Sequence, residues 1–178
     1  MRGYFGIGIE QSSKLMNAGN LFRTAHAFGA SFMFTINSKY SINKAKSDTS
    51  AAPRSIPWYD FSSVANLKLP GGCVLVGVEF LEEAVMLPVF RHPPNAAYIL
   101  GPEMGKLSPE ILQLCQHIIK IPTRFSLNVA TTGAIILYDR IRTLGNYGER
   151  PVSPSGVSLP PLEHVHGSPI RRKNKNRA

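Results

Sequence analysis

Three short polar segments carry the side chains of this chain that could do chemistry. The first segment begins at Asn17 and includes Arg23. The second is built around Glu103, and the third runs from Ser126 to Asn128. Together they supply a guanidinium, a carboxylate, a hydroxyl and two amides. The set holds no nucleophile beside a base and no cluster of metal ligands, so it suits the placement of a substrate hydroxyl against a reactive cofactor better than hydrolysis.

Each of the three segments also has an ordinary structural interpretation. Asn17 is predicted to cap a helix whose second turn carries Arg23, and a capping Asn with a solvated Arg is a common arrangement. Glu103 lies in a turn sequence and could simply face solvent. Ser126 has the residue type of a helix N-cap, which is the usual interpretation of such a residue. Taken singly, no segment identifies a function.

The elements that must position these side chains alternate between strands and helices. Buried or β-rich runs predict strands at residues 4–9, 31–36, 73–78, 97–100 and 117–121. Helical periodicity and end signals predict helices at residues 17–29, 108–114 and 126–144, with a short helix at 61–67 and a long polar loop at 37–57. Ser108 is expected to cap the second of these helices, with Pro109 in its first turn. The alternation predicts a parallel α/β sheet flanked by helices.

The place of Glu103 in this order is informative. It follows the strand at 97–100 almost directly, and ligands of open α/β sheets bind outside the carboxyl ends of the strands. Gly101 has no side chain, so a ligand can approach the backbone there. Ser126 opens the last predicted helix, whose free N–H groups can meet a carboxylate or a sugar oxygen. The second and third segments therefore lie where a polar ligand would bind.

The charge of the chain favours a polyanionic partner. The 178 residues carry a formal net charge of +9, with 43% hydrophobic residues. Residues 151–178 hold five Lys and Arg against Glu163, a net +4, which leaves +5 on residues 1–150. We expect residues 1–150 to form one domain and the proline-rich, basic residues 151–178 to form a flexible tail. Nucleic acid is the first partner to consider, and a merely basic protein is the alternative.

Several other classes of protein are poor matches. Cys73 and Cys115 are the only cysteines and lie in apolar runs, so we expect buried, reduced thiols. The five histidines are scattered, and no metal site is expected. Gly6-Ile-Gly8 lacks the third glycine of a dinucleotide fingerprint. No apolar run is long enough for a membrane span, and Glu10 comes too early for a secretory signal, so a cytoplasmic location is expected.

The three segments, with their flanks, resemble the motifs of the SpoU (TrmH-like) branch of the SPOUT methyltransferases. The first motif, N-x-x-N-x-x-R-T followed by A-x-A-F-G, matches residues 17–29 throughout. The second, G-x-E-x-x-G-L-S, matches residues 101–108 except that Gly105-Lys106 replaces x-Gly. The third comprises I-P at 121–122, S-L-N-V at 126–129 and L-Y-[DE] at 137–139. The resemblance covers roughly residues 4–145.

The resemblance implies a SPOUT fold with a C-terminal trefoil knot, and a homodimer. It implies that S-adenosylmethionine binds in the knot and that the ribose 2′-hydroxyl of tRNA or rRNA is methylated, with no metal. Carried over by position, the catalytic residues are Asn17, Arg23, Glu103, Ser126 and Asn128. The cofactor is expected to lie against Val78, Glu79, Leu100, Gly101, Ile121 and Leu127.

Two further interpretations compete with a ribose methyltransferase. One is a catalytically silent RNA-binding SPOUT module with a degenerate cofactor site, against which the complete motif set argues. The other is a methyltransferase for a substrate other than RNA, which fits the positive charge less well. The role of Arg23 also has two versions. Either the guanidinium takes the proton of the hydroxyl, or it clamps a phosphate and stabilises developing alkoxide charge, which we prefer because free guanidinium is a permanent cation.

Overall fold

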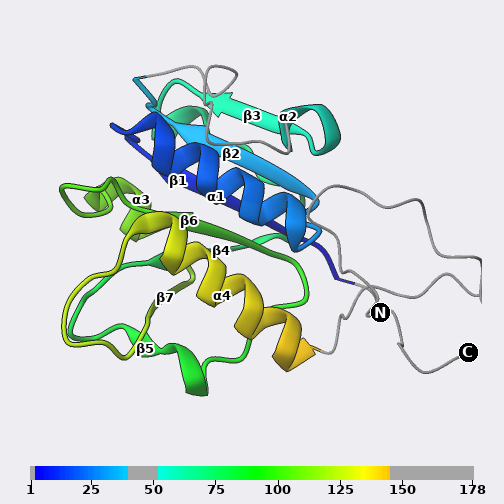
Figure 1. Cartoon of the computed structure of the whole chain (residues 1–178). Helices are drawn as coiled ribbons and strands as arrows, with labels where there is room; N and C mark the ends of the chain where they lie inside the picture. The colour runs from blue at the N-terminus through cyan, green and yellow to red at the C-terminus, as the bar shows by residue number, and fades with distance from the viewer. Residues whose placement is uncertain (1–2, 40–51, 145–178) are drawn as a thin grey trace, which may run out of the picture. The chain divides into compact units, whose positions relative to one another are not determined.

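The computed structural model describes residues 3–39 and 52–144, and within them the parallel α/β prediction is confirmed. The described strands form one sheet in which every pairing is parallel (Figure 1). Their order across the sheet is β3-β2-β1-β6-β4-β7-β5. The strands are β1 (Phe5–Glu10), β2 (Phe32–Ile36), β3 (Trp58–Phe61), β4 (Val74–Val78), β5 (Val85–Met86), β6 (Ala96–Leu100) and β7 (His117–Lys120). The predicted tail and most of the predicted loop at 37–57 lie outside the described residues.

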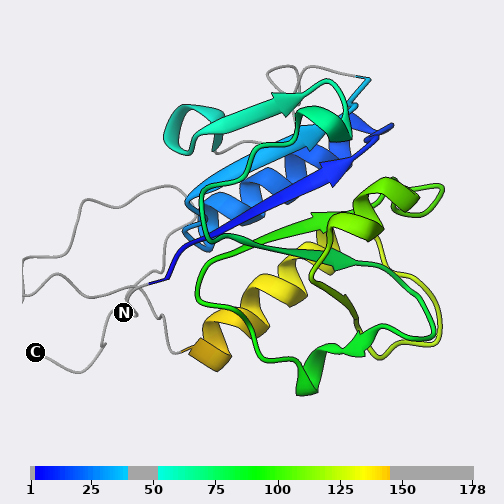
Figure 2. The ribbon, with the colours of Figure 1, turned by 180° about the vertical axis from the view of Figure 1, so that it is seen from behind.

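Helices cover both faces of the sheet. The helices α1 (Leu15–Ala27) and α4 (Val129–Leu144) lie side by side over one face (Figure 1). At Gly133 a side chain would overlap Leu21, so this glycine lets α4 approach α1 closely. Figure 2 shows the opposite face, which carries α3 (Pro109–Leu114). The buried Ile111 of α3 packs there in a second hydrophobic cluster, with side chains of β2, β4 and β6.

The central strand β6 illustrates why strands of this sheet could be predicted from the sequence. Every residue of β6 is buried, because β1 and β4 flank it and helices or loops cover both faces. Such a strand needs a continuous apolar run, and Ala96–Leu100 is one. The parallel registers bring the carboxyl ends of β1, β6 and β4 to the same edge of the sheet. The segments that follow these three strands therefore lie close together at that edge.

Two predicted helix ends are wrong, and one is confirmed. The helix α1 begins before Asn17, with Lys14 at its N-cap and no side-chain cap, and the Asn17 amide bonds to Glu103, outside the helix. The helix α4 begins at Val129, so Ser126 is not its cap. Ser108 does cap α3, since its hydroxyl accepts the N–H of Ile111 at 3.3 Å.

The short elements between β2 and β6 were the least predictable. The strand β3 begins directly after the loop expected at 37–57, where no strand was predicted, and the helix expected at 61–67 is a 3₁₀ turn, η2 (Val64–Asn66). The predicted loop at 37–57 also contains the one-turn helix α2 (Ala52–Ser55). A two-residue strand, β5, and the turn η3 (Leu87–Val89) lie where no element was predicted. Elements this short have no periodicity to detect.

A buried arginine closes the amino end of the sheet. Arg140 of α4 is 1% exposed. One guanidinium nitrogen donates to the carbonyl of Pro93 at 2.7 Å and to the Tyr98 hydroxyl at 3.1 Å. The other donates to the carbonyls of Pro94 at 2.6 Å and Tyr4 at 3.4 Å. The cation is thus compensated by oxygen atoms from three segments of the chain, as a buried charge must be.

A second buried polar group lies beside this arginine. The ring nitrogens of His92 lie 2.6 Å from the Tyr98 hydroxyl and 3.1 Å from Asp139. Burial lowers the pKa of His92, although the hydrogen bond and charge of Asp139 oppose the shift. Burial raises the pKa of Tyr98 to about 12. Both rings are therefore neutral at physiological pH, and the network joins α4 to the segment before β6.

Other structural expectations can be compared with the described residues. Cys73 and Cys115 are free thiols, as predicted, but both are half-buried rather than fully buried. Burial raises the pKa of Cys115 to about 12, so this thiol stays protonated. In the described part of the chain, no helix is long and apolar enough to cross a membrane. No three His, Cys, Asp or Glu side chains group there as a metal site would require.

Replacement of Arg140 should destabilise the fold strongly. Arg140→Ala leaves carbonyls and a hydroxyl unpaired in the interior, so we expect a loss of about 3 kcal/mol or more in unfolding free energy. Arg142→Ala is the matched control, because Arg142 is mostly exposed and pairs with Asp139 on the surface; its cost should stay below about 1 kcal/mol. Urea denaturation measures both. Equal losses for the two variants would contradict the structural role of Arg140.

Candidate active site

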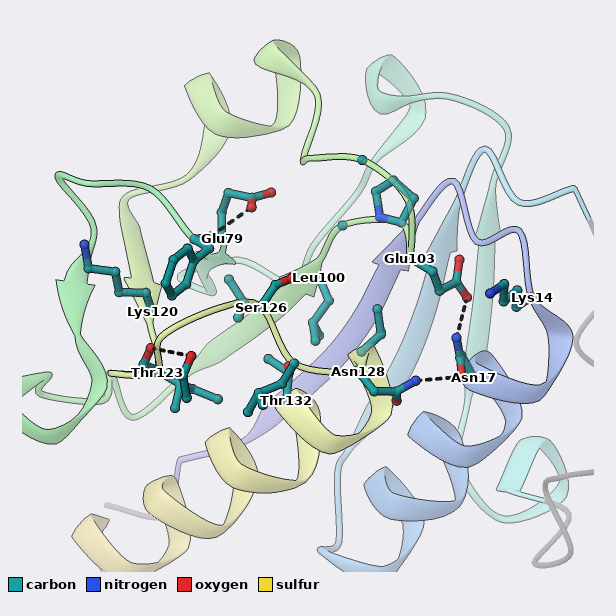
Figure 3. Close-up of a pocket in the computed structure, with 18 residues that line it drawn as sticks. Lys14, Asn17, Glu79, Leu100, Glu103, Lys120, Thr123, Ser126, Asn128 and Thr132 are labelled. Atoms are coloured by element: carbon teal, nitrogen blue, oxygen red, sulfur yellow. Dashed lines mark hydrogen bonds between the residues drawn. The ribbon is translucent and has the colours of Figure 1, made fainter.

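A polar cavity lies at the carboxyl edge of the sheet. It has a volume of about 350 Å³ and opens beside the ends of β4, β6 and β7, between the first turns of α1 and α4 (Figure 3). Its apolar floor comes from strand ends and the segment before α4. Its polar groups come from loops and helix starts. The predicted site residues among its lining are Asn17, Val78, Glu79, Leu100, Gly101, Glu103, Ile121, Ser126, Leu127 and Asn128.

Hydrogen bonds join one residue from each of the three sequence segments. The amide nitrogen of Asn17 donates to Glu103 Oε1 at 3.2 Å. The amide nitrogen of Asn128 donates to Asn17 Oδ1 at 3.0 Å. Ser13 completes the set, because its hydroxyl and its backbone N–H donate to Glu103 Oε2 at 2.8 Å and 3.2 Å. Figure 3 shows the three side chains in a row at one side of the cavity.

The environment of Glu103 favours its charged form. Partial burial alone would raise the pKa of this carboxyl. The hydrogen bonds that it accepts from its own backbone N–H, Ser13 and Asn17 outweigh burial, and they hold the pKa below the ordinary value of 4.5. Glu103 is therefore an anion at neutral pH. All of these donors are neutral groups, so the carboxylate keeps its negative charge within the chain.

Asn128 has two functions at the start of α4. Its Oδ1 accepts the N–H of Ala130 at 2.9 Å and that of Thr131 at 3.4 Å, which is the role of a helix cap. Its amide nitrogen donates a hydrogen bond to Asn17. The cap therefore belongs to Asn128, and the exposed Ser126 hydroxyl lies at the cavity two residues earlier.

Arg23 is the predicted catalytic residue that does not line the cavity. It lies on the exposed side of α1, six residues beyond Asn17, and the helix carries it away from the pocket of its own chain. The other ten predicted site residues all line the cavity. Asn17 lines the cavity from the first turn of α1, whereas Arg23, further along the same helix, does not.

Several lining residues had no signal in the sequence. Lys14 is the N-cap of α1 and Thr132 lies on the first turn of α4, and Lys120 and Thr123 lie around the end of β7. The Lys120 ammonium donates to the carbonyls of Leu81 and Glu82 at 2.6 Å and 2.7 Å, so it holds the loop after β4. Each of these residues becomes informative only when the strand order is known. Single Lys and Thr residues are too common in sequences to single out.

Comparison with known proteins identifies the family. The profile of the SpoU rRNA Methylase family matches residues 5–138, three quarters of the sequence. The chain therefore belongs to the SpoU rRNA Methylase family, and the resemblance seen in the three motifs is confirmed. Among curated proteins, none matches this sequence.

Solved structures agree with this assignment at the level of the fold. The SpoU methyltransferase AviRb from Streptomyces viridochromogenes has a TM-score of 0.70 and 22% identity, over 82% of this chain and 62% of AviRb. The A. aeolicus TrmH/SpoU tRNA modifying enzyme has a TM-score of 0.67 and 20% identity, over 88% and 84% of the two chains. A structure concerned with the 2-OH methylation of C/U34 on tRNA has a TM-score of 0.69 and 23% identity, over 83% of this chain and all of that one. This chain spans about three fifths of the length of AviRb.

The charge of Glu103 should appear in the pH dependence of stability. Because the folded pKa lies below 4.5, the contribution of this carboxylate is complete above that pH and is lost as the pH falls through the folded pKa. We expect Glu103→Gln to cost about 1 kcal/mol at pH 7, the ordinary net value of one hydrogen bond, and to cost progressively less below pH 4.5.

Thermal unfolding of wild type and Glu103→Gln between pH 3 and pH 7 measures this difference. The exposed Glu83, in the turn after β4, gives the matched control Glu83→Gln. A difference between wild type and Glu103→Gln that did not change with pH would contradict the assigned charge.

Proposed function

We propose that this chain is an S-adenosylmethionine-dependent RNA methyltransferase that transfers a methyl group to a ribose 2′-hydroxyl of tRNA or rRNA. Membership of the SpoU rRNA Methylase family supports the reaction class. The observation that carries the proposal is the hydrogen-bonded set of Asn17, Glu103 and Asn128 beside the cavity. Three separate motifs thus supply polar groups to one point, as the placement of a single hydroxyl requires.

The cavity fits S-adenosylmethionine in size and chemistry. A volume of about 350 Å³ lies within the range of about 300–1,000 Å³ that is usual for small-molecule sites. Val78, Leu100, Ile121 and Leu127 offer apolar surface beside the backbone of three strand ends. AviRb, which shares the fold, has been solved in complex with AdoMet. When bound, the cofactor supplies the electrophilic methyl group that the hydroxyl accepts.

The residues of the chain would act mainly by positioning. In-line approach of a hydroxyl to a sulfonium methyl group is an orientation problem, and favourable positioning can lower a barrier by about 7–11 kcal/mol. In the proposed complex, Ser126 and Asn128 hold the hydroxyl and the loop before α4. Glu103 orients the Arg23 guanidinium, which clamps a phosphate and stabilises developing alkoxide charge. We prefer this clamp because a charged guanidinium has no lone pair to accept a proton.

A homodimer would account for the position of Arg23. This residue is exposed on α1 and does not line the cavity of its own chain. We infer a two-fold dimer in which Arg23 of each copy reaches the cavity of the other copy. The anionic Glu103, surrounded by neutral donors, provides a complementary charge for that guanidinium.

The remaining parts of the proposal follow from the family resemblance and the charge. We propose that the polypeptide forms the trefoil knot of SPOUT proteins around the cofactor site. We propose that residues 1–150 form the methyltransferase domain, that residues 151–178 form a basic tail, and that the protein acts in the cytoplasm. The tail would contribute to RNA binding, because its net charge of +4 attracts phosphates.

Calorimetric titration with S-adenosylmethionine, followed by methyl transfer into bulk tRNA and rRNA, tests the proposed function. We expect one cofactor site per chain and a 2′-O-methylated nucleoside identified by mass spectrometry. RNA binding without cofactor binding or transfer would favour the silent RNA-binding module. Transfer of a methyl group to a base instead of a ribose would overturn the proposed acceptor.

Arg23 variants should show whether the guanidinium must bind a phosphate in a bidentate manner or whether a positive charge at this position is enough. Arg23→Lys keeps the charge but loses the bidentate geometry, so we expect a methyl-transfer rate at least about tenfold below wild type and close to that of Arg23→Ala. Cofactor affinity should not change in either variant. A rate near wild type for Arg23→Lys would contradict bidentate clamping.

Mixed dimers extend the same experiment to the shared site. Asn128→Asp keeps the capping oxygen of α4 and loses the amide donor to Asn17. Mixing this variant with Arg23→Ala should restore up to about a quarter of wild-type activity, because half of the dimers are mixed and each has one intact site. No restoration after confirmed subunit exchange would contradict a site shared between copies.

A further inference from the structure

We infer that Glu79 is a positioning residue whose side chain joins the two loops on either side of the cavity and so sets the affinity for the cofactor. The inference rests on the proposed function in naming S-adenosylmethionine as the ligand. Glu79 follows β4 directly and is half-buried. Its Oε1 accepts the N–H of Phe80 at 2.9 Å, and its Oε2 accepts the N–H of Leu107 at 2.7 Å.

The two N–H groups belong to different walls of the cavity. Phe80 begins the loop after β4 and lines one side. Leu107 ends the loop after β6, in which Gly101, Glu103 and Gly105 line the other side. In Figure 3, Glu79 lies at the end of β4, across the cavity from the Asn17–Glu103 pair. One carboxylate therefore holds both loops, and the width of the cavity between them depends on it.

The loop after β6 is folded back tightly at the point that Glu79 holds. A side chain at Gly101 would come within 3.0 Å of the Leu107 nitrogen and within 3.5 Å of Glu79 Oε2. The Leu107 side chain is itself 3% exposed and packs in the hydrophobic cluster under the sheet. The last residue of the loop, Leu107, thus lies close to its first residue, Gly101. The Leu107 side chain is held in the hydrophobic cluster, and its N–H is held by Glu79.

A second carboxylate provides an internal comparison. Glu10, the last residue of β1, is 1% exposed, and its Oε2 accepts the N–H of Ser108 at 2.8 Å. Because β6 lies between β1 and β4, Glu10 and Glu79 hold consecutive N–H groups from opposite sides. Glu10 does not line the cavity, and Ser108 caps α3. Glu10 therefore secures the helix start, whereas Glu79 secures the cavity wall.

The same conservative substitution should affect these two residues differently. Both oxygens of Glu79 accept N–H groups, and a glutamine has one oxygen, so Glu79→Gln must lose one bond and turn an NH₂ group toward an N–H donor. In the described part of the chain, Glu10 accepts one such bond, which Glu10→Gln retains by orienting its oxygen toward Ser108. A general need for negative charge at this edge would affect both variants equally.

Calorimetric titration of S-adenosylmethionine into the full chain tests the inference with Glu79→Gln, Glu10→Gln and the exposed control Glu83→Gln. We expect Glu79→Gln to raise the dissociation constant about tenfold or more, as loss of a charge-assisted hydrogen bond predicts. The KM for the cofactor should rise likewise, with kcat at saturation within about threefold of wild type. The other two variants should bind as wild type does.

Amide hydrogen exchange provides a measurement that does not depend on the ligand. In Glu79→Gln, the N–H groups of Phe80 or Leu107 should exchange faster, while the amides of the buried strand β6 keep wild-type rates. Wild-type affinity in Glu79→Gln, or equal weakening in Glu10→Gln, would overturn the inference. Failure of the wild type to bind the cofactor would overturn the proposed function, and the exchange rates would then decide the joining role of Glu79 alone.

Discussion

Carboxylates that accept backbone N–H groups hold together the carboxyl edge of this sheet. Glu10, Glu79 and Glu103 each follow or end a strand, and each accepts an N–H from a segment far away in sequence. The loops that meet there have no regular structure to pair their own amides, and unpaired amides in a folded interior are costly. A charged acceptor gives stronger and shorter bonds than a carbonyl. Of the three carboxylates, Glu79 and Glu103 line the cavity, and Glu10 secures the start of α3 beside it.

Polar backbone groups are paired by side chains of opposite charge at the two ends of the sheet. At the amino end, the guanidinium of Arg140 donates to carbonyls and leaves a closed, fully packed interior. At the carboxyl end, anions accept amides and leave a cavity between the loops. The cation is buried under α4, where it joins the last described helix to the entry of β6.

The sequence predicted the elements that are long or buried on both faces. Residues 73–78 and 97–100 were readable as strands because burial demands an uninterrupted apolar run. The strand β3 was missed because its four residues are half-exposed and form a strand only beside β2. Asn17 was misassigned as a cap because its partner, Glu103, lies 86 positions further along the chain. Sequence patterns indicate contacts between residues that are close in the chain, whereas the residues of this site are distant in sequence.

The same limit applies to Arg23, and it bears on the proposed mechanism. A guanidinium placed beside Glu103 within one chain would neutralise it before any substrate arrived. The described structure instead holds this carboxylate with neutral donors only, and the cations that line the cavity in the described residues are Lys14 and Lys120. Lys120 is engaged by two carbonyls. Glu103 therefore keeps a negative charge beside the cavity, which would attract both the sulfonium cofactor and the guanidinium of the proposed complex. In the proposed dimer, a second copy of the chain supplies that guanidinium, so that pairing of Arg23 with Glu103 and completion of the site become one event.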